Sequence, residues 1–116
     1  MALNDNGLNA MGDGLAALVT HASLHTADPG TDGSNESSAA RQAVTIQVSA
    51  AGVMTLTNVA FTGGASSGSV FSIGLWDAST SGNFYGDQAI ETGDTSFNAA
   101  GEFTVTSMTI TPTSSD

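Results

Sequence analysis

The sequence predicts a mainly β protein: an antiparallel β-sandwich or jelly-roll-like barrel of about seven short strands with one N-terminal α-helix. Short segments of alternating apolar and polar residues recur at intervals of about 8–12 residues, as in such folds. Gly, Ala, Ser and Thr make up 61 of the 116 residues, a composition typical of strands joined by tight turns. One apolar stripe has helical spacing, near the N-terminus. We therefore expect a helix within residues 1–18 and a single β domain over residues 19–116.

The N-terminal stripe consists of Leu8, Met11, Leu15 and Leu18, spaced by three, four and three residues. This spacing places the four side chains on one helix face and predicts a helix over residues 5–18. Three glycines within it each cost up to about 1 kcal/mol relative to alanine. Such a helix should form when its stripe packs against its own sheet or against a neighbouring subunit, so we expect these four side chains to be an interface.

The expected strands follow from alternation and turn residues. They are a strand at 19–26, a hairpin over 44–62 that turns at Ala51-Gly52, a central apolar strand at 70–77, short strands at 84–85, at 88–92 and around Phe97, and a last strand at 102–111. In the last strand Phe103 and Val105 share one parity, whereas Met108 and Ile110 share the other. A bulge or twist near Ser107 would absorb this slip.

The charge balance excludes several classes of partner. Eleven acidic residues face one Arg and no Lys, which gives a formal net charge of −10. Nothing neutralises phosphate groups, so we expect no nucleic-acid partner and no anionic membrane partner. The apolar runs are too short for a transmembrane helix, and the N-terminus lacks the basic and apolar regions of a secretory signal. The absence of cysteine excludes disulfides and thiolate metal sites.

The acidic loop at residues 28–36 contains the oxygen ligands that Ca²⁺ prefers, in Asp28, Asp32 and Glu36. The spacing does not fit an EF-hand, and an ordinary turn in which Asp binds its own backbone explains the same residues. His21 and His25 would lie about 13 Å apart on a strand, too far to share a zinc ion. We expect no metal and no cofactor, with calcium in this loop as the alternative.

No arrangement of residues in the sequence indicates catalysis. The serines lack the G-x-S-x-G spacing of a nucleophile elbow, and no Gly-rich phosphate loop carries a lysine. The spacing of the carboxylates places no two of them across a cleft as an acid and a base. We expect no catalytic residue and a protein that is not an enzyme.

Two single residues have expected structural roles. Arg41 is the one basic side chain, and its planar guanidinium can bind a carboxylate through two hydrogen bonds. We expect Arg41 to pair with Glu36 or Asp28 and to hold the 28–40 loop against the start of the next strand; a solvated arginine is the alternative. Trp76 is expected to fill the core, with an interface anchor as the alternative.

Two blocks of the sequence contain distinctive motifs. The first block comprises SLHTADPGT (23–31), Gly33, Asn35-Glu36 and ARQAV (40–44), and the second comprises IGLWDA (73–78) and GNFYG (82–86). The two blocks resemble a family of small structural proteins of tailed-bacteriophage virions, often labelled tail fibre or minor structural proteins. The opening Leu3-Asn4-Asp5 fits the same family. One departure is Ala39, which stands where such proteins often carry an aromatic residue before Ala-Arg-Gln.

The resemblance implies a virion structural protein without a catalytic residue. The expectation we favour is a capsid-surface accessory, a decoration or minor capsid protein, that binds itself, possibly as a trimer, and the major capsid protein. One alternative is a tail accessory or fibre protein that binds tail subunits. A further alternative is a module that binds host-surface carbohydrate through Trp76 and Tyr85.

Overall fold

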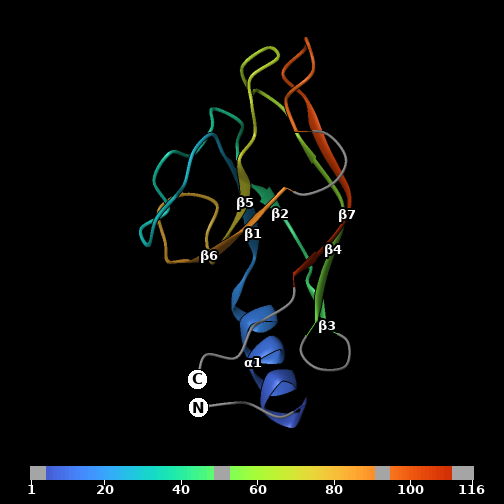
Figure 1. Cartoon of the computed structure of the whole chain (residues 1–116). Helices are drawn as coiled ribbons and strands as arrows, with labels where there is room; N and C mark the ends of the chain where they lie inside the picture. Colours follow the sequence, from blue (N-terminus) through green and yellow to red (C-terminus); the bar gives the residue numbers. More distant parts are fainter. Residues whose placement is uncertain (1–4, 49–52, 91–94, 111–116) are drawn as a thin grey trace.

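The computed structural model describes residues 5–48, 53–90 and 95–110, and within the first helix it describes side chains from Ala10 onward. The fold consists of two antiparallel sheets and one N-terminal helix (Figure 1). One sheet has the order β2-β1-β5-β6 and the other β3-β4-β7, and the two do not close into a barrel. The sandwich expectation is confirmed. The elements are α1 (Asp5–Leu18), β1 (His21–His25), β2 (Gln42–Ala43), β3 (Gln47–Val48), β4 (Met54–Phe61), β5 (Ser72–Trp76), β6 (Phe84–Ala89) and β7 (Phe103–Ile110).

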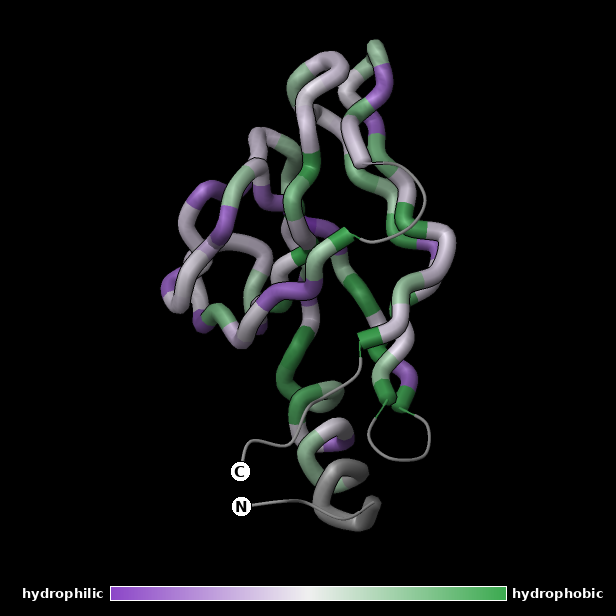
Figure 2. The backbone as a smooth tube through the Cα atoms, in the orientation of Figure 1, coloured by the Kyte–Doolittle hydropathy of each residue, from purple (hydrophilic) through white to green (hydrophobic). Residues whose placement is uncertain are grey.

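The apolar core lies between the two sheets. Leu24 of β1 and Ile73 of β5 contribute to it from the first sheet, and Leu56, Phe61 and Phe103 contribute from the second. All five side chains are almost fully buried. In Figure 2 the hydrophobic segments follow the strands, and hydrophilic segments are most frequent in the loops around the first sheet. Alternating residues thus give each sheet one apolar inner face.

The helix α1 projects beyond one end of the sheets (Figure 1). It contacts β3, and Leu15 is half-buried against the core. Met11 and Leu18, on the same stripe, remain 51% and 52% exposed. The side chain of Leu8 lies outside the described part. The sheets therefore cover Leu15 of the predicted stripe and leave Met11 and Leu18 about half exposed to solvent. Within the described part of the chain, no helix is long and apolar enough to cross a bilayer.

The hairpin expected over 44–62 is shorter than predicted. Its strands are β3 and β4, paired from Gln47↔Thr55 to Val48↔Met54, and the turn at 51–52 lies outside the described residues. The residues before β3 belong to the other sheet. There β2 pairs with β1, and the Val44 amide donates to the Thr20 carbonyl. The segment 42–48 therefore gives one short edge strand to each sheet and crosses between them.

The apolar strand expected to be central is confirmed as β5, which lies between β1 and β6. The two short strands expected at 84–85 and 88–92 form one strand, β6, up to Ala89, with a register shift opposite Leu75 and Trp76. Residues 91–92 lie outside the described part. Around Phe97 the chain forms one isolated bridge, between Ser69 and Ser96, rather than a strand. The Phe97 ring is nevertheless buried in the core.

The slip predicted in the last strand occurs as a change of face shared by β4 and β7. In β4 the buried positions are Met54 and Leu56 before Asn58, and Val59 and Phe61 after it. Asn58 has a left-handed φ of 54°, a conformation that asparagine tolerates better than most residues and that turns the following side chains over. The register between β4 and β7 is the same before and after Asn58, with Thr57 paired to Ser107 before it and Val59 paired to Val105 after it. The strands thus change face together without losing their alignment.

Candidate functional site

The outer face of β1 and β5 is as fully buried as the face that meets the core. Ser23, His25 and Trp76 project from this face, and Gly74 lies directly opposite Ser23. A Cβ at Gly74 would come within 2.5 Å of His25 Nε2 and 2.7 Å of Ser23 Oγ. Gly74 therefore provides the space in which the polar side chains of β1 lie across the strand. The large side chain that lies over Gly74 is the imidazole of His25.

A chain of hydrogen bonds links these side chains. Trp76 Nε1–H donates to Ser23 Oγ at 2.8 Å, and the Ser23 hydroxyl lies 2.6 Å from His25 Nε2. His25 Nδ1 lies 2.8 Å from the carbonyl oxygen of Ser34. Because a carbonyl only accepts, Nδ1 carries the hydrogen, which leaves Nε2 to accept from Ser23. Every polar atom of this buried chain is thus satisfied, and β1, β5 and the loop after β1 are connected through it.

The loop after β1 covers the outer face through Gly33. Its φ of 78° is left-handed, and a Cβ there would come within 2.5 Å of the Trp76 ring. Phe84 of β6 completes the aromatic layer, with its ring centroid 5.0 Å from Trp76 and 5.8 Å from His25. Glycine meets both requirements at this position, a positive φ and the close approach of an aromatic ring.

Arg41 closes this layer, with its side chain 7% exposed. Its Cζ lies 3.5 Å from the Trp76 ring centroid, a cation–π geometry. Nε donates to Glu36 Oε1 at 2.8 Å, and one terminal nitrogen donates to Oε2 at 3.2 Å. The other terminal nitrogen donates to the carbonyl oxygens of Ala78 at 3.0 Å and Ser81 at 2.7 Å. One guanidinium therefore connects the loop after β1, the β5 tryptophan and the loop between β5 and β6.

The loop between β5 and β6 is held at its ends by Asp77. The Asp77 carboxylate accepts hydrogen bonds from the amide and the side chain of Asn83 and from the Tyr85 hydroxyl. The hydrogen bonds from Asn83 lower the pKa of Asp77 below its usual value of 3.8. Loss of solvent around the Tyr85 hydroxyl, followed by the adjacent Asp77 charge, raises the pKa of Tyr85. Asp77 thus fixes the loop whose carbonyl oxygens Arg41 binds.

Sequence reasoning had expected an ion pair for Arg41, and the structure places Glu36, rather than Asp28, at the guanidinium. The Ala78 and Ser81 carbonyls were missed, because backbone acceptors have no side-chain signature. The Ser23–His25 connection was also missed. The sequence did contain a signal for this connection. His21, Ser23 and His25 alternate along one strand and so share one face, and the expected neighbouring strand carries Gly74. Ala39 has no aromatic ring to offer the Arg41 guanidinium, and the ring that packs against it comes from Trp76 of β5.

The three acidic residues weighed for calcium have separate partners. Asp28 accepts from the Gly30 amide at 2.9 Å, and Asp32 accepts from the amide and hydroxyl of Ser34, which lowers its pKa. Glu36 binds Arg41. Over residues 5–48, 53–90 and 95–110, no three His, Asp or Glu side chains gather in a way that could hold a metal ion. His21 instead lies 2.9 Å from the Thr20 hydroxyl.

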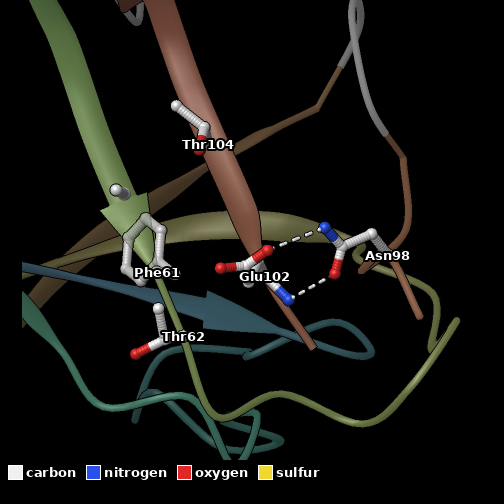
Figure 3. Close-up of a pocket in the computed structure, with 6 residues that line it drawn as sticks. Phe61, Thr62, Asn98, Glu102 and Thr104 are labelled. Atoms are coloured by element: carbon white, nitrogen blue, oxygen red, sulfur yellow. Dashed lines mark hydrogen bonds between the residues drawn. The ribbon is translucent and has the colours of Figure 1, made fainter. Parts of the chain in front are cut away.

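The residues weighed for carbohydrate binding differ in accessibility. Trp76 is 6% exposed and lies beneath Arg41, whereas Tyr85 is 37% exposed. A hollow of about 180 Å³ lies elsewhere, at the end of β4 and β7 (Figure 3). There the Asn98 side chain donates to Glu102 Oε1 and accepts from the Glu102 amide, so its polar groups already bind each other. The accessible aromatic residue and the hollow are therefore separate features.

Comparison with known proteins identifies the chain as a structural protein of bacteriophage virions. A family model described as "Podophage GP4 fiber I protein gp80" matches residues 9–113, nearly the whole chain, and the chain belongs to this family. It is a virion component. The same comparisons found no match among curated proteins or among solved structures.

Replacing Arg41 tests its role as the connection between three segments. Arg41→Ala removes charge-assisted hydrogen bonds worth about 1.5–3 kcal/mol each, and we expect a loss of about 2–4 kcal/mol in the free energy of unfolding because such bonds do not add fully. Arg41→Lys keeps the charge but not the planar fork, so its loss should be intermediate. Urea denaturation measures both. Limited proteolysis should cut the alanine variant faster within residues 28–40, and an unchanged cleavage rate would contradict the role.

Two buried serines in the same sheet form a matched pair. Ser23→Ala leaves His25 Nε2 and Trp76 Nε1 without partners and should cost about 1–3 kcal/mol. Ser72 is equally buried, but its hydroxyl has no hydrogen-bond partner among the described residues. Ser72→Ala should therefore be neutral or stabilising. Equal losses in thermal unfolding for the two variants would show that the Ser23 network adds nothing beyond packing.

The lowered pKa of Asp77 predicts a dependence of stability on pH. A carboxyl whose pKa is lower in the folded than in the unfolded chain stabilises the fold above its usual value of 3.8, and this contribution is lost as pH falls through the folded value. Asp77→Asn should flatten the fall in melting temperature below about pH 4. Asp87→Asn changes the net charge equally at a residue with no side-chain hydrogen bond in the described part. This variant controls for the loss of one negative charge, and a similar effect of both variants would exclude a specific role for Asp77.

Proposed function

We propose that the chain is a non-enzymatic component of a phage tail or fibre, and that it works by assembly with neighbouring subunits. The family match over residues 9–113 carries this proposal, since the family is described by a fibre protein. It favours the tail or fibre alternative over the capsid-surface accessory that the sequence led us to expect. The loops that Arg41 joins are consistent with a structural role without catalysis, because the polar groups around Arg41 bind one another and hold the fold together.

We place the contact with a neighbouring virion protein on the α1 stripe. Met11 and Leu18 are large apolar side chains that remain about half exposed on a helix projecting from the sheets. Covering such a side chain completely contributes about 1.5–3 kcal/mol. Contacts of this size are weak singly, and repetition over many copies in one particle makes them strong.

The location of the chain in the particle tests the proposed function directly. A tagged chain should produce additional density on the tail or its fibres in electron cryomicroscopy of purified particles. Density on the capsid shell would support the capsid-surface accessory instead. Particles that lack the chain altogether would contradict both functions.

The α1 contact has its own test. Met11→Ser combined with Leu18→Ser should lower the melting temperature only slightly, because both side chains are already about half exposed, and should reduce the number of copies per particle. Phe71→Ser is the matched control, since Phe71 is 46% exposed but lies outside the helix. Quantitative immunoblots of purified particles measure the copy number. Equal occupancy for the double variant and the wild type would contradict the α1 contact.

A further inference from the structure

Among the described strands, one sheet edge is long and unprotected. Proteins usually protect edges with short strands, charges or bulges. β2 and β3 have two residues each, and β6 carries Asp87 and a register shift. β7 has eight residues and contains neither a charge nor a proline. It pairs with β4 along one side, and in the described part of the chain its other side forms no backbone hydrogen bond.

The change of face makes β7 complementary to itself. Phe103 and Val105 face the core in its first half, and Met108 and Ile110 pack against the core in its second half. These four positions are symmetric about the midpoint between residues 106 and 107. Two antiparallel copies centred there would place Phe103 opposite Ile110 and Val105 opposite Met108. A strand with regular alternation would place each apolar residue opposite a residue of the other face in this alignment.

The exposed face obeys the same symmetry. Thr104 would lie opposite Thr109, and Thr106 opposite Ser107, and all four are exposed. Cross-strand Thr–Thr and Thr–Ser pairs favour strand pairing through hydrogen bonds between their hydroxyl groups. Apolar residues would thus meet apolar residues on the inner face, and hydroxyl residues would meet hydroxyl residues on the outer face.

Charge also favours this edge for contact between identical chains. Each copy carries a net charge of −10, so an acidic contact would place like charges together. The strands β3, β4 and β7 contain no charged residue. The nearest acid, Glu102, precedes β7, so the two Glu102 residues would lie at opposite ends of the pairing, about 30 Å apart at 3.3 Å per residue. That distance exceeds the screening length of about 10 Å at 0.1 M salt.

We propose that β7 pairs antiparallel with β7 of a second copy of this chain, about a two-fold axis between Thr106 and Ser107. The pairing joins two three-stranded sheets into one continuous sheet. It deepens the proposed function by naming one partner and one surface, and it rests on that function for the role of the pair in the particle.

Charge variants at the two-fold axis test the pairing. By light scattering after size exclusion, the wild-type chain should have twice its monomer mass of 11.5 kDa. Thr106→Glu with Ser107→Glu places carboxylates opposite carboxylates and should give monomers. Thr106→Glu with Ser107→Lys places opposite charges across the axis and should keep the dimer. Both positions are exposed, and circular dichroism checks that each variant is folded.

The matched control is Thr45→Glu with Gln47→Glu, which adds the same charge at exposed positions on the β3 side of the same sheet, away from the β7 edge. It should remain dimeric. A wild-type chain that is monomeric at its highest soluble concentration would overturn the pairing. So would a dimer that survives Thr106→Glu with Ser107→Glu, or a control that dissociates equally.

Cysteine variants test the alignment, because the chain contains no cysteine of its own. Thr104→Cys with Thr109→Cys should form disulfide-linked dimers on mild oxidation, since the two positions lie opposite each other across the axis. Each single variant should stay unlinked, because its own copy in the partner lies five residues away, about 16 Å along the strand. Efficient linking of Thr104→Cys alone would indicate a different register or orientation of the two strands and overturn the proposed pairing.

These results can be separated from the proposed function. A monomeric chain that still localises to the tail would overturn the strand pairing and leave the fibre function intact. A dimer with the predicted alignment that is absent from the tail would support the pairing and contradict the fibre function.

Discussion

The loops around the first sheet depend on one guanidinium. Arg41 is the single cation of the chain, and its nearly buried charge is compensated by Glu36, by two carbonyl oxygens and by the face of Trp76. A buried charge is costly unless such partners surround it. No second basic residue exists to replace it. Among the described residues, the hydrogen bonds that join the loop after β1 to the loop between β5 and β6 therefore all come from a single side chain.

The sequence was sufficient for features set by local periodicity. The α1 bounds followed from the helical spacing of the stripe from Leu8 to Leu18, and the central position of β5 followed from its being the most apolar of the expected strands. The division of 42–48 between two sheets could not be predicted, since the pairing partners are decided by contacts distant in sequence. The left-handed conformation of Asn58 could not be predicted either. The change of apolar parity was visible in the β7 sequence, but nothing in the β4 sequence indicated that its side chains change face at Asn58.

In the candidate site, predictability followed the chemistry of the partners. The pairing of Arg41 with a carboxylate of the preceding loop followed from the scarcity of positive charge. Its other partners are backbone carbonyl oxygens, which every residue carries, so no residue type marks them. A glycine inside an apolar strand indicates that a large neighbour lies close to it, but nothing in the sequence marks His25 as the neighbour of Gly74.

Arg41 holds the loop between β5 and β6 through the main chain of Ala78 and Ser81, and Asp77 holds it from the strand side. Between these anchors, Ser79 and Thr80 are exposed, and in the described structure their side chains form no hydrogen bond. Main-chain anchoring is indifferent to side-chain identity. Side chains of other size or polarity at Ser79 and Thr80 would therefore leave intact the hydrogen bonds that hold this loop.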